Sequence, residues 1–198
     1  MKKYKLAVFA SGSGTNAESI ILHFKDHAFI EVAGVLCNKP GAGVIARAER
    51  LGVSVLVFSR KDFGEKGVVH QWLHNQNVDY LILAGFLWRV PEYLVKEYRG
   101  RILNIHPALL PAYSGKGMYG EHVHRAVLAA KEKESGITIH RVDEIYDHGE
   151  ILFQARCPVQ PDDTPDTLAL RIHELEHRFY PDIIEKVILE DARNEKAF

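Results

Sequence analysis

The stretch LAVFASGSGTN (residues 6–16) joins a short apolar run to a glycine-rich turn and then to an amphipathic segment. Residues 6–10 show no polar alternation, which is typical of a central strand of a parallel sheet, buried on both faces. Gly12 and Gly14 allow the chain to turn tightly, and residues 16–24 have helical spacing of their apolar side chains. The stretch therefore predicts a strand, a tight turn and a helix, which form the first unit of an α/β fold.

The alternation of apolar runs with amphipathic stretches continues along the chain. Short runs rich in β-branched and aromatic residues predict further strands at 32–37, 53–58, 80–84 and 101–105. Amphipathic stretches between them predict helices at 44–51, 68–75 and 91–98. This order predicts an α/β fold with an open, mostly parallel twisted sheet and helices on both faces, a Rossmann-like arrangement.

The pattern changes after residue 106. A loop at 108–120, rich in glycine and proline, precedes a short helix at 122–131. Two strand-like runs, 137–142 and 151–155, predict an antiparallel strand pair near the C-terminal part of the chain. A final helix, capped by Asp163 and Thr164, is expected to run to about Leu189, and residues 190–198 are expected to form a frayed polar tail. No repeat or linker divides the sequence, so residues 1–198 are expected to form a single domain.

Composition excludes several classes of protein. The chain has 198 residues, of which 46% are hydrophobic and 26% charged, and its net charge is −1. A balanced charge argues against non-specific nucleic-acid binding, and two cysteines rule out a disulfide scaffold. No apolar run is long enough to span a membrane, and the N-terminus lacks the features of a signal peptide. We expect a soluble, cytoplasmic protein that binds small molecules, contacts neither nucleic acid nor membrane, and is a monomer or a weak homodimer.

The glycine-rich turn at residues 11–16 is the first candidate binding site. Backbone N–H groups at the start of a helix can hold a phosphate or a carboxylate. As a dinucleotide fingerprint the turn is incomplete, because Ala17 replaces the third glycine and residues 37–39 lack the acidic residue that would bind a ribose. A monophosphate site is therefore favoured over a nicotinamide cofactor, and a turn without a ligand stays an alternative.

Asn104 and His106 form the second candidate site, at the carboxyl end of the last strand of the parallel run. Strand alternation puts both on one face, and open α/β sheets bind ligands at this end of their strands. An amide and an imidazole can both donate to an oxyanion that develops on a carbonyl. The loop at 143–147 supplies Asp143, Glu144 and Asp147, and a carboxylate beside His106 would raise the pKa of the imidazole. The alternatives are a histidine packed under a loop and a solvated acidic turn.

Two histidine patterns in the sequence could supply ligands to a metal ion. His173-Glu174-Leu175-Glu176-His177 matches the zincin pattern H-E-x-x-H on a predicted helix, where Glu174 could act as a base. No third ligand is evident, so a zinc hydrolase is kept only as an alternative. His122 and His124 give a weaker signal, because ligands two positions apart need a strand and a further partner.

Taken together, several motifs resemble the folate-dependent formyltransferases. The signature is Asn104-Ile105-His106-Pro107-Ala108-Leu109-Leu110-Pro111, supported by the motifs at 11–16, 83–86, 136–140 and 146–149. All of them occur in the order found in that family, and together they cover about residues 6–189. The closest resemblance is to the members that formylate glycinamide ribonucleotide in purine synthesis.

The resemblance implies an activity and a set of site residues. The reaction would move the formyl group of 10-formyltetrahydrofolate to the amine of N1-(5-phospho-D-ribosyl)glycinamide, with no metal cofactor. The implied catalytic triad is Asn104, His106 and Asp147. The residues implied for the ribonucleotide are Gly14, Thr15, Asn16, His173 and Glu176. Those implied for the folate are Leu87, Trp88, Arg89, Val90, Asn104, His140, Asp143, Glu144, Ile145, Tyr146 and Asp147.

The sequence departs from the family at three places. Residues 87–89 are Leu-Trp-Arg where many members have Met-Arg, residues 61–67 do not align, and the loop at 114–120 is longer. We hypothesise that this loop is a lid with glycine hinges. Methionyl-tRNA formyltransferase and formyltetrahydrofolate hydrolase share the triad but carry an added domain, so the length disfavours both. Hydrolysis of the formyl donor, a zinc hydrolase and a non-catalytic nucleotide-binding protein remain as rivals.

Overall fold

The computed structural model describes residues 3–195. In this part of the chain, seven strands form one sheet in the order β3-β2-β1-β4-β5-β6-β7. The strands are β1 (Tyr4–Ala10), β2 (Ile30–Cys37), β3 (Val55–Val57), β4 (Tyr80–Leu83), β5 (Ile102–His106), β6 (Glu134–Arg141) and β7 (Ile151–Pro158). Strands β1 to β5 pair in parallel, whereas β6 and β7 are antiparallel to their neighbours. The predicted α/β fold, with a mostly parallel sheet and an antiparallel pair, is confirmed.

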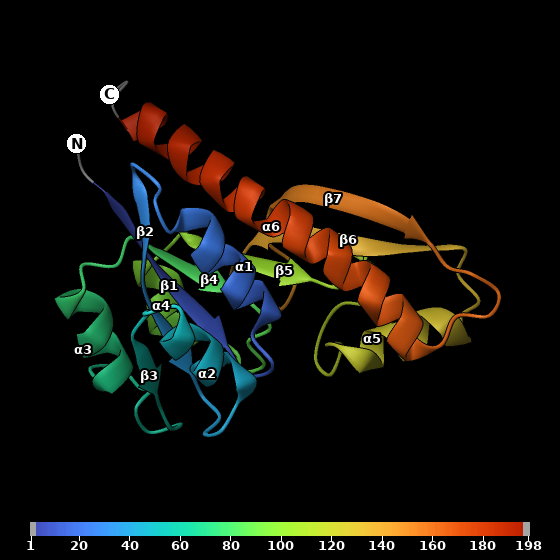
Figure 1. The fold of residues 1–198 in the computed structure, drawn as a ribbon, viewed down its shortest axis with the longest axis horizontal. Helices are drawn as coiled ribbons and strands as arrows, with labels where there is room; N and C mark the ends of the chain where they lie inside the picture. Colours follow the sequence, from blue (N-terminus) through green and yellow to red (C-terminus); the bar gives the residue numbers. More distant parts are fainter. Residues whose placement is uncertain (1–2, 196–198) are drawn as a thin grey trace.

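Within the described residues, six helices pack around the sheet. They are α1 (Thr15–Phe24), α2 (Gly43–Arg50), α3 (Val68–Asn75), α4 (Glu92–Glu97), α5 (Glu121–Ala129) and α6 (Pro165–Glu195). The buried side chains of β1 alternate between two cores: Leu6 and Val8 face α1 and α6, and Ala7 and Phe9 face α3 and α4. Helices therefore cover both faces of the sheet, as predicted, and the long helix α6 crosses one of them (Figure 1).

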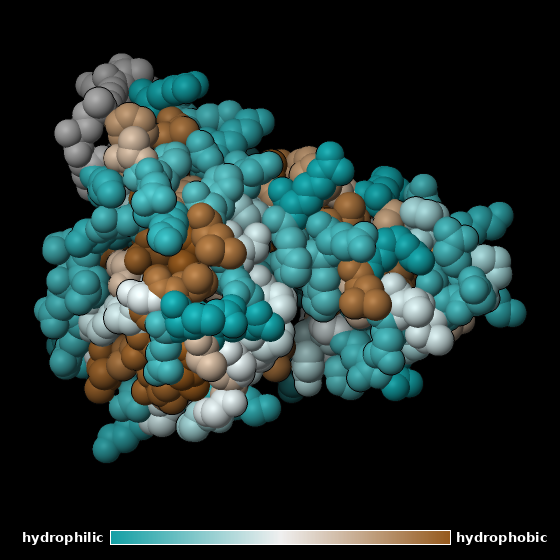
Figure 2. Space-filling view, viewed as in Figure 1, coloured by the Kyte–Doolittle hydropathy of each residue, from teal (hydrophilic) through white to brown (hydrophobic). Residues whose placement is uncertain are grey.

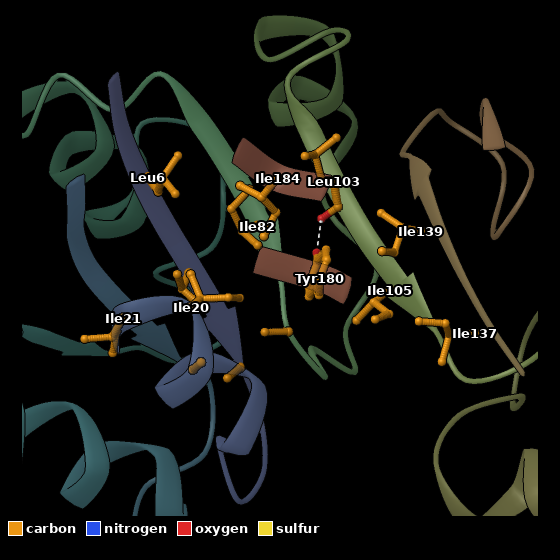
Figure 3. Close-up of a cluster of buried hydrophobic side chains, with 14 of the residues drawn as sticks. Leu6, Ile20, Ile21, Ile82, Leu103, Ile105, Ile137, Ile139, Tyr180 and Ile184 are labelled. Atoms are coloured by element: carbon orange, nitrogen blue, oxygen red, sulfur yellow. Dashed lines mark hydrogen bonds between the residues drawn. The ribbon is translucent and has the colours of Figure 1, made fainter. Parts of the chain in front are cut away.

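Helix α6 is fastened to the sheet by Tyr180, which is fully buried. Its hydroxyl, with one proton to donate, lies 3.0 Å from the carbonyl oxygens of both Leu83 and Leu103. These residues belong to β4 and β5, and Ile82 and Ile184 pack beside the contact (Figure 3). Burial raises the pKa of Tyr180 well above its usual value, so the hydroxyl stays protonated as a donor. The phenol thus fixes α6 against β4 and β5, the two strands whose carboxyl ends reach the candidate site.

The predicted end of the last helix is wrong. The helix continues six residues past Leu189, to Glu195, so residues 190–195 are helical and not a frayed tail, while 196–198 lie outside the described residues. Asp191 explains the extension, because its carboxylate pairs with Arg141 at 3.0 Å and accepts a hydrogen bond from Tyr80 at 2.9 Å. Long-range polar contacts, which local composition does not reveal, thus stabilise the last turns.

The predicted start of α6 is confirmed, because the Thr164 hydroxyl accepts the hydrogen bond of the Thr167 N–H at 3.2 Å. Within the described residues, no helix is long and apolar enough to cross a membrane. Figure 2 shows a mostly hydrophilic surface on the face that carries α6, with hydrophobic residues in small separate patches.

Candidate active site

A cavity of about 690 Å³ lies beyond the carboxyl ends of β1, β4 and β5. It is the position that a doubly wound sheet offers to ligands. Every residue implied for the catalytic triad, the ribonucleotide and the folate lines this cavity, including residues 14–16, the segments 87–90 and 143–147, and the histidines His106, His140 and His173. The structure therefore brings the predicted residues together, and their individual chemical roles stay predictions.

One side of the cavity, which we call the strand corner, contains Asn104, His106, His140 and Asp147. Antiparallel pairing of β5 with β6 sets Asn104 opposite His140. The Nδ1 atom of His140 lies 2.9 Å from the Arg141 carbonyl oxygen, which only accepts, so Nδ1 carries the proton. In the neutral ring, which burial favours by lowering the pKa of His140, Nε2 is free to accept. Nε2 lies 3.0 Å from the Asn104 Nδ2 atom, so the amide donates one proton to His140 and keeps the other for the cavity.

His106 is buried beside Asp147. Its Nδ1 atom lies 3.7 Å from Asp147 Oδ1, a distance that suits a charged pair when the imidazole is protonated but is too long for a hydrogen bond. Asp143 is instead occupied by His148 at 2.9 Å, and Glu144 pairs with Arg99. Of the three carboxylates expected near His106, Asp147 is therefore the one that the fold turns toward it.

The loop after β5 makes backbone contacts with both members of this pair. His106 Nε2 lies 2.8 Å from the carbonyl oxygen of Tyr113, so Nε2 carries a proton and donates it. The N–H of Gly115 donates to Asp147 Oδ2 at 3.0 Å. Tyr113 and Asp147 both have positive φ, 56° and 52°, a region that residues other than glycine seldom adopt. Sequence reasoning did not find these backbone contacts, because no side-chain motif encodes them.

Thr138 anchors the beginning of that loop. Its buried hydroxyl donates to the Ala108 carbonyl at 2.6 Å and accepts from the Leu110 N–H at 3.0 Å. Gln154 on β7 donates to the same hydroxyl at 2.9 Å. The antiparallel strands β6 and β7 thus hold the chain where it leaves β5, directly after His106.

The other side of the cavity, which we call the helical corner, contains Asn16, His173 and Glu176. Glu176 is buried, and its Oε2 atom accepts hydrogen bonds from Asn16 Nδ2 and from His173 Nδ1, each 2.8 Å long. The bond to Glu176 raises the pKa of His173 above its usual value. Asn16 Oδ1 is buried without a partner in the structure, so a donor on a ligand could satisfy it.

The glycine-rich turn lies beside the helical corner. Gly14 precedes α1 with φ of +81°, and a Cβ there would come within 2.5 Å of Val44, so this position requires glycine. No side chain caps α1, so N–H groups of its first turn are available to a ligand, and Gly14, Thr15 and Asn16 line the cavity. The geometry fits the predicted phosphate site, because a helix start binds an anion through just these groups.

The segments 87–90 and 143–147, which we call the loop wall, meet across the mouth of the cavity. Arg89 donates to the Glu144 carbonyl at 2.8 Å, and its guanidinium lies 5.8 Å from the centre of the Tyr146 ring. Trp88 packs against Phe58 and Phe63, so the segment 61–67, which does not align with the family, supports the loop wall through Phe63.

The metal patterns predicted as alternatives are not assembled. Within residues 3–195, His173 and His177 belong to no group of three His, Cys, Asp or Glu residues whose ligand atoms all lie within 4.8 Å of one another. Glu174, the expected base, is exposed and outside the cavity. His122 is also exposed, whereas His124 is buried, lines the cavity and has an Nδ1 atom without a partner. His124 is thus a site residue that we had considered only as half of a metal pair.

Comparison with known proteins agrees with this geometry. The family model described as formyl transferase matches residues 4–184. The phosphoribosylglycinamide formyltransferase of Bacillus subtilis (strain 168) is 38% identical over 202 residues, which span all of both chains. The trifunctional purine biosynthetic protein adenosine-3 of Drosophila melanogaster is 41% identical over 91% of this chain, but the match covers only 14% of the fly protein.

Solved structures are similar over nearly the whole chain. The phosphoribosylglycinamide formyltransferase of Anaplasma phagocytophilum has a TM-score of 0.86 and 32% identity, and the match covers 96% of this chain and 89% of that one. The phosphoribosylglycinamide formyltransferase of Bacillus halodurans has a TM-score of 0.84 and 39% identity, and the match covers 93% of this chain and 95% of that one. Both solved structures thus share the fold of this chain.

Proposed function

The chain belongs to the formyl transferase family, and from this we propose that its cavity carries out a formyl transfer from 10-formyltetrahydrofolate to phosphoribosylglycinamide. It acts as a phosphoribosylglycinamide formyltransferase, a one-carbon transferase of purine biosynthesis. The observation that carries the proposal is the cavity itself, in which Asn104, His106 and Asp147 lie between a helix start suited to phosphate and a loop wall.

The ribonucleotide binds at the helical corner in this proposal. Its 5'-phosphate is held by the N–H groups that follow Gly14, at Thr15 and Asn16. Glu176 and His173 contact the ribosyl part, and the unpaired Asn16 Oδ1 is available to a ribose hydroxyl. The negative charge of Glu176 is already shared by two donors, which lowers the cost of keeping it buried.

The folate binds along the loop wall in this proposal. Residues 87–90 and 143–147 supply apolar surface at Leu87 and Ile145, both about half exposed, together with the Tyr146 ring. A flat heterocycle can lie against this surface while backbone groups bond to its edge. The formyl group then points toward Asn104, between the two corners.

The chemical step is attack of the substrate amine on the formyl carbon. The C–N bond that forms leaves a tetrahedral oxyanion, and collapse expels the folate nitrogen, which takes a proton that the amine loses through a bound water. The second N–H of Asn104 and the Nε2–H of His106 donate to the oxyanion. A preorganised donor of this kind contributes about 3 kcal/mol, or roughly a hundredfold in rate.

In this proposal, Asp147 stabilises the charge on His106, and the loop after β5 determines what the His106 Nε2–H donates to. The carboxylate, 3.7 Å from Nδ1, stabilises positive charge on the ring while Nε2 donates. In the structure Nε2 donates to the Tyr113 carbonyl instead, an oxygen that stands where a formyl oxygen could accept. The segment that carries the Tyr113 carbonyl must therefore shift when the substrates bind, which supports the idea that the loop that follows it, 114–120, is a lid.

The remaining expectations belong to the same proposal. The chain acts as a single catalytic domain, uses no metal in the reaction, and works in the cytoplasm as a monomer or weak homodimer. Small molecules are its partners, as the relatives' names imply.

The test is to mix the pure protein with 10-formyltetrahydrofolate and follow the release of tetrahydrofolate. We expect release only when phosphoribosylglycinamide is present. Release without it would indicate a hydrolase, and no release under either condition would contradict the proposal. Mass spectrometry of the ribonucleotide should show the added formyl group.

A further inference from the structure

A cluster of two histidines and a glutamate lies on the face of the sheet covered by α3 and α4. His70 and His74 are one turn apart on α3, and Glu97 is the last residue of α4. None of the three lines the active-site cavity, and α3 lies at the end of the molecule remote from α5 (Figure 1). The cluster has no place in the proposed formyl transfer.

Its ligand atoms converge on one point. His70 Nε2 lies 3.0 Å from His74 Nε2 and 3.0 Å from Glu97 Oε2. His74 Nε2 lies 2.8 Å from Glu97 Oε1. The His70 ring is held in place by an edge contact with Tyr93, with ring centres 5.2 Å apart. Two imidazole nitrogens and a carboxylate thus form a small triangle.

No placement of protons on the two Nε2 atoms gives all three contacts of this triangle a favourable hydrogen bond. Each Nε2 atom has a single site in the ring plane, which holds either a proton or a lone pair. If both Nε2 atoms carry protons and donate them to Glu97, the two N–H groups lie against each other, because the nitrogens are only 3.0 Å apart. If instead one Nε2 accepts a hydrogen bond from the other, the lone pair of the accepting nitrogen faces a carboxylate oxygen and repels it. A cation removes the conflict, because all three atoms can then present lone pairs to it.

We propose that His70, His74 and Glu97 form a binding site for a divalent transition-metal ion, with zinc the best match. Imidazole nitrogen and carboxylate oxygen are zinc ligands at about 2.0–2.2 Å, which in a tetrahedral site are roughly 3.3 Å apart. The triangle needs to widen by only about 0.4 Å, and the His74 side chain, 58% exposed, can move that far.

The fourth position would be filled by water. The cluster opens on a surface hollow of about 380 Å³, which His70 and His74 line together with Lys66, Gln71 and Asn75. Lys66 is exposed, so its ammonium can stay in solvent while the ion is bound. The ion would cross-link α3 to α4, the helix that directly follows the wall segment 87–90, and would stabilise the fold without entering the reaction.

A second histidine pair provides a matched control. His23, in the last turn of α1, and His27, just beyond the end of that helix, have the same spacing in sequence and also face one carboxylate, Glu185. There the two nitrogens also approach different oxygens of one carboxylate, at 2.7 Å and 3.4 Å, but within the described residues no hydrogen-bond contact joins the two imidazoles, so two donated protons satisfy the cluster. It does not form a group with three converging ligand atoms within the described chain.

The experiment is calorimetric titration of zinc chloride into chelator-treated full-length protein, followed by thermal unfolding with and without zinc. We expect zinc to bind and to raise the unfolding temperature. His74→Gln and Glu97→Gln should each weaken this binding more than about tenfold, since even outer-shell changes cost that much. His23→Gln should leave it unchanged. Cobalt in place of zinc should give the visible absorption of a four-coordinate site only when His74 is present.

Two results would overturn the proposal. One is no binding to the wild-type protein at millimolar zinc. The other is wild-type affinity and stoichiometry in both His74→Gln and Glu97→Gln, which would assign the zinc to other histidines. Circular dichroism and an unchanged formyl-transfer rate show that each variant is folded, and neither readout depends on zinc.

Discussion

The two corners of the cavity are held together in different ways. In the helical corner, Asn16 and Glu176 are 160 positions apart and joined by a side-chain hydrogen bond of 2.8 Å. In the strand corner, Asp147 stays 3.7 Å from His106, and both are bonded to the backbone of a loop. The helical corner is therefore preorganised by the packing of α1 against α6. The strand corner holds its donors in contacts that a substrate must replace.

This difference predicts which substitutions affect the rate and which affect binding. Changes in the strand corner should lower the rate constant, because in the proposed mechanism its donors act on charge that develops in the transition state. Changes in the helical corner should weaken binding of the ribonucleotide, because its bonds exist before the reaction begins.

The largest effect is expected for Asn104→Ala. The variant removes a donor to the oxyanion, which should lower kcat by roughly a hundredfold or more. The KM for phosphoribosylglycinamide should change little, because the helical corner is intact. Steady-state kinetics measure both constants, and a thermal unfolding curve controls for folding. A variant that keeps most of its kcat would remove Asn104 from the catalytic set.

Glu176→Gln should have the next largest effect, on the KM for the ribonucleotide rather than on kcat. The amide cannot accept from Asn16 and His173 as the carboxylate does, and a charge-assisted hydrogen bond contributes about 2 kcal/mol. The KM for the ribonucleotide should rise roughly thirtyfold, with the KM for the folate unchanged. Glu174→Gln is the matched control, because Glu174 lies on the same helix outside the cavity. Equal effects of the two variants would contradict the assignment.

The same contrast explains how much of the site the sequence predicts. Asn104 and His106 follow from strand alternation at the end of β5, and the turn at Gly14 follows from its glycines, because short-range patterns encode both. The pairing of Asn16 with Glu176 depends on how α6 packs, and the Tyr113 and Gly115 contacts use backbone atoms that no residue type specifies. The extension of α6 to Glu195 was likewise missed, because it depends on Asp191 meeting Arg141 and Tyr80.

A smaller effect is expected when the loop of the strand corner is probed by protease. Gly115 and Gly120 bound a segment that lines the cavity, and Lys116 within it is exposed to trypsin. Bound substrates add contacts to this segment, so cleavage after Lys116 should slow roughly tenfold at substrate concentrations ten times Kd. Cleavage after Lys133, which lies outside the cavity, serves as the control. Equal slowing at both sites, or none at Lys116, would contradict a lid.

The smallest effect concerns the pH dependence of stability. A histidine of the strand corner and one of the helical corner should contribute to the free energy of unfolding with opposite dependence on pH. Burial lowers the pKa of His140, so the unfolded chain binds a proton more readily. Its contribution to stability is present above its usual pKa of 6.5 and is lost as the pH falls below that value. The hydrogen bond to Glu176 raises the pKa of His173, whose contribution is present below 6.5 and is lost as the pH rises through the folded pKa.

Urea unfolding across this pH range measures both contributions. His140→Gln should reduce the slope with which the free energy of unfolding falls below pH 6.5, by at most about 1.4 kcal/mol per pH unit. His173→Gln should flatten the loss on the alkaline side by less, because its side chain is 49% exposed and solvent screens the pair. If both variants changed the same limb of the curve, the two histidines would share one electrostatic environment. The separation of the cavity into two independently built corners would then be wrong.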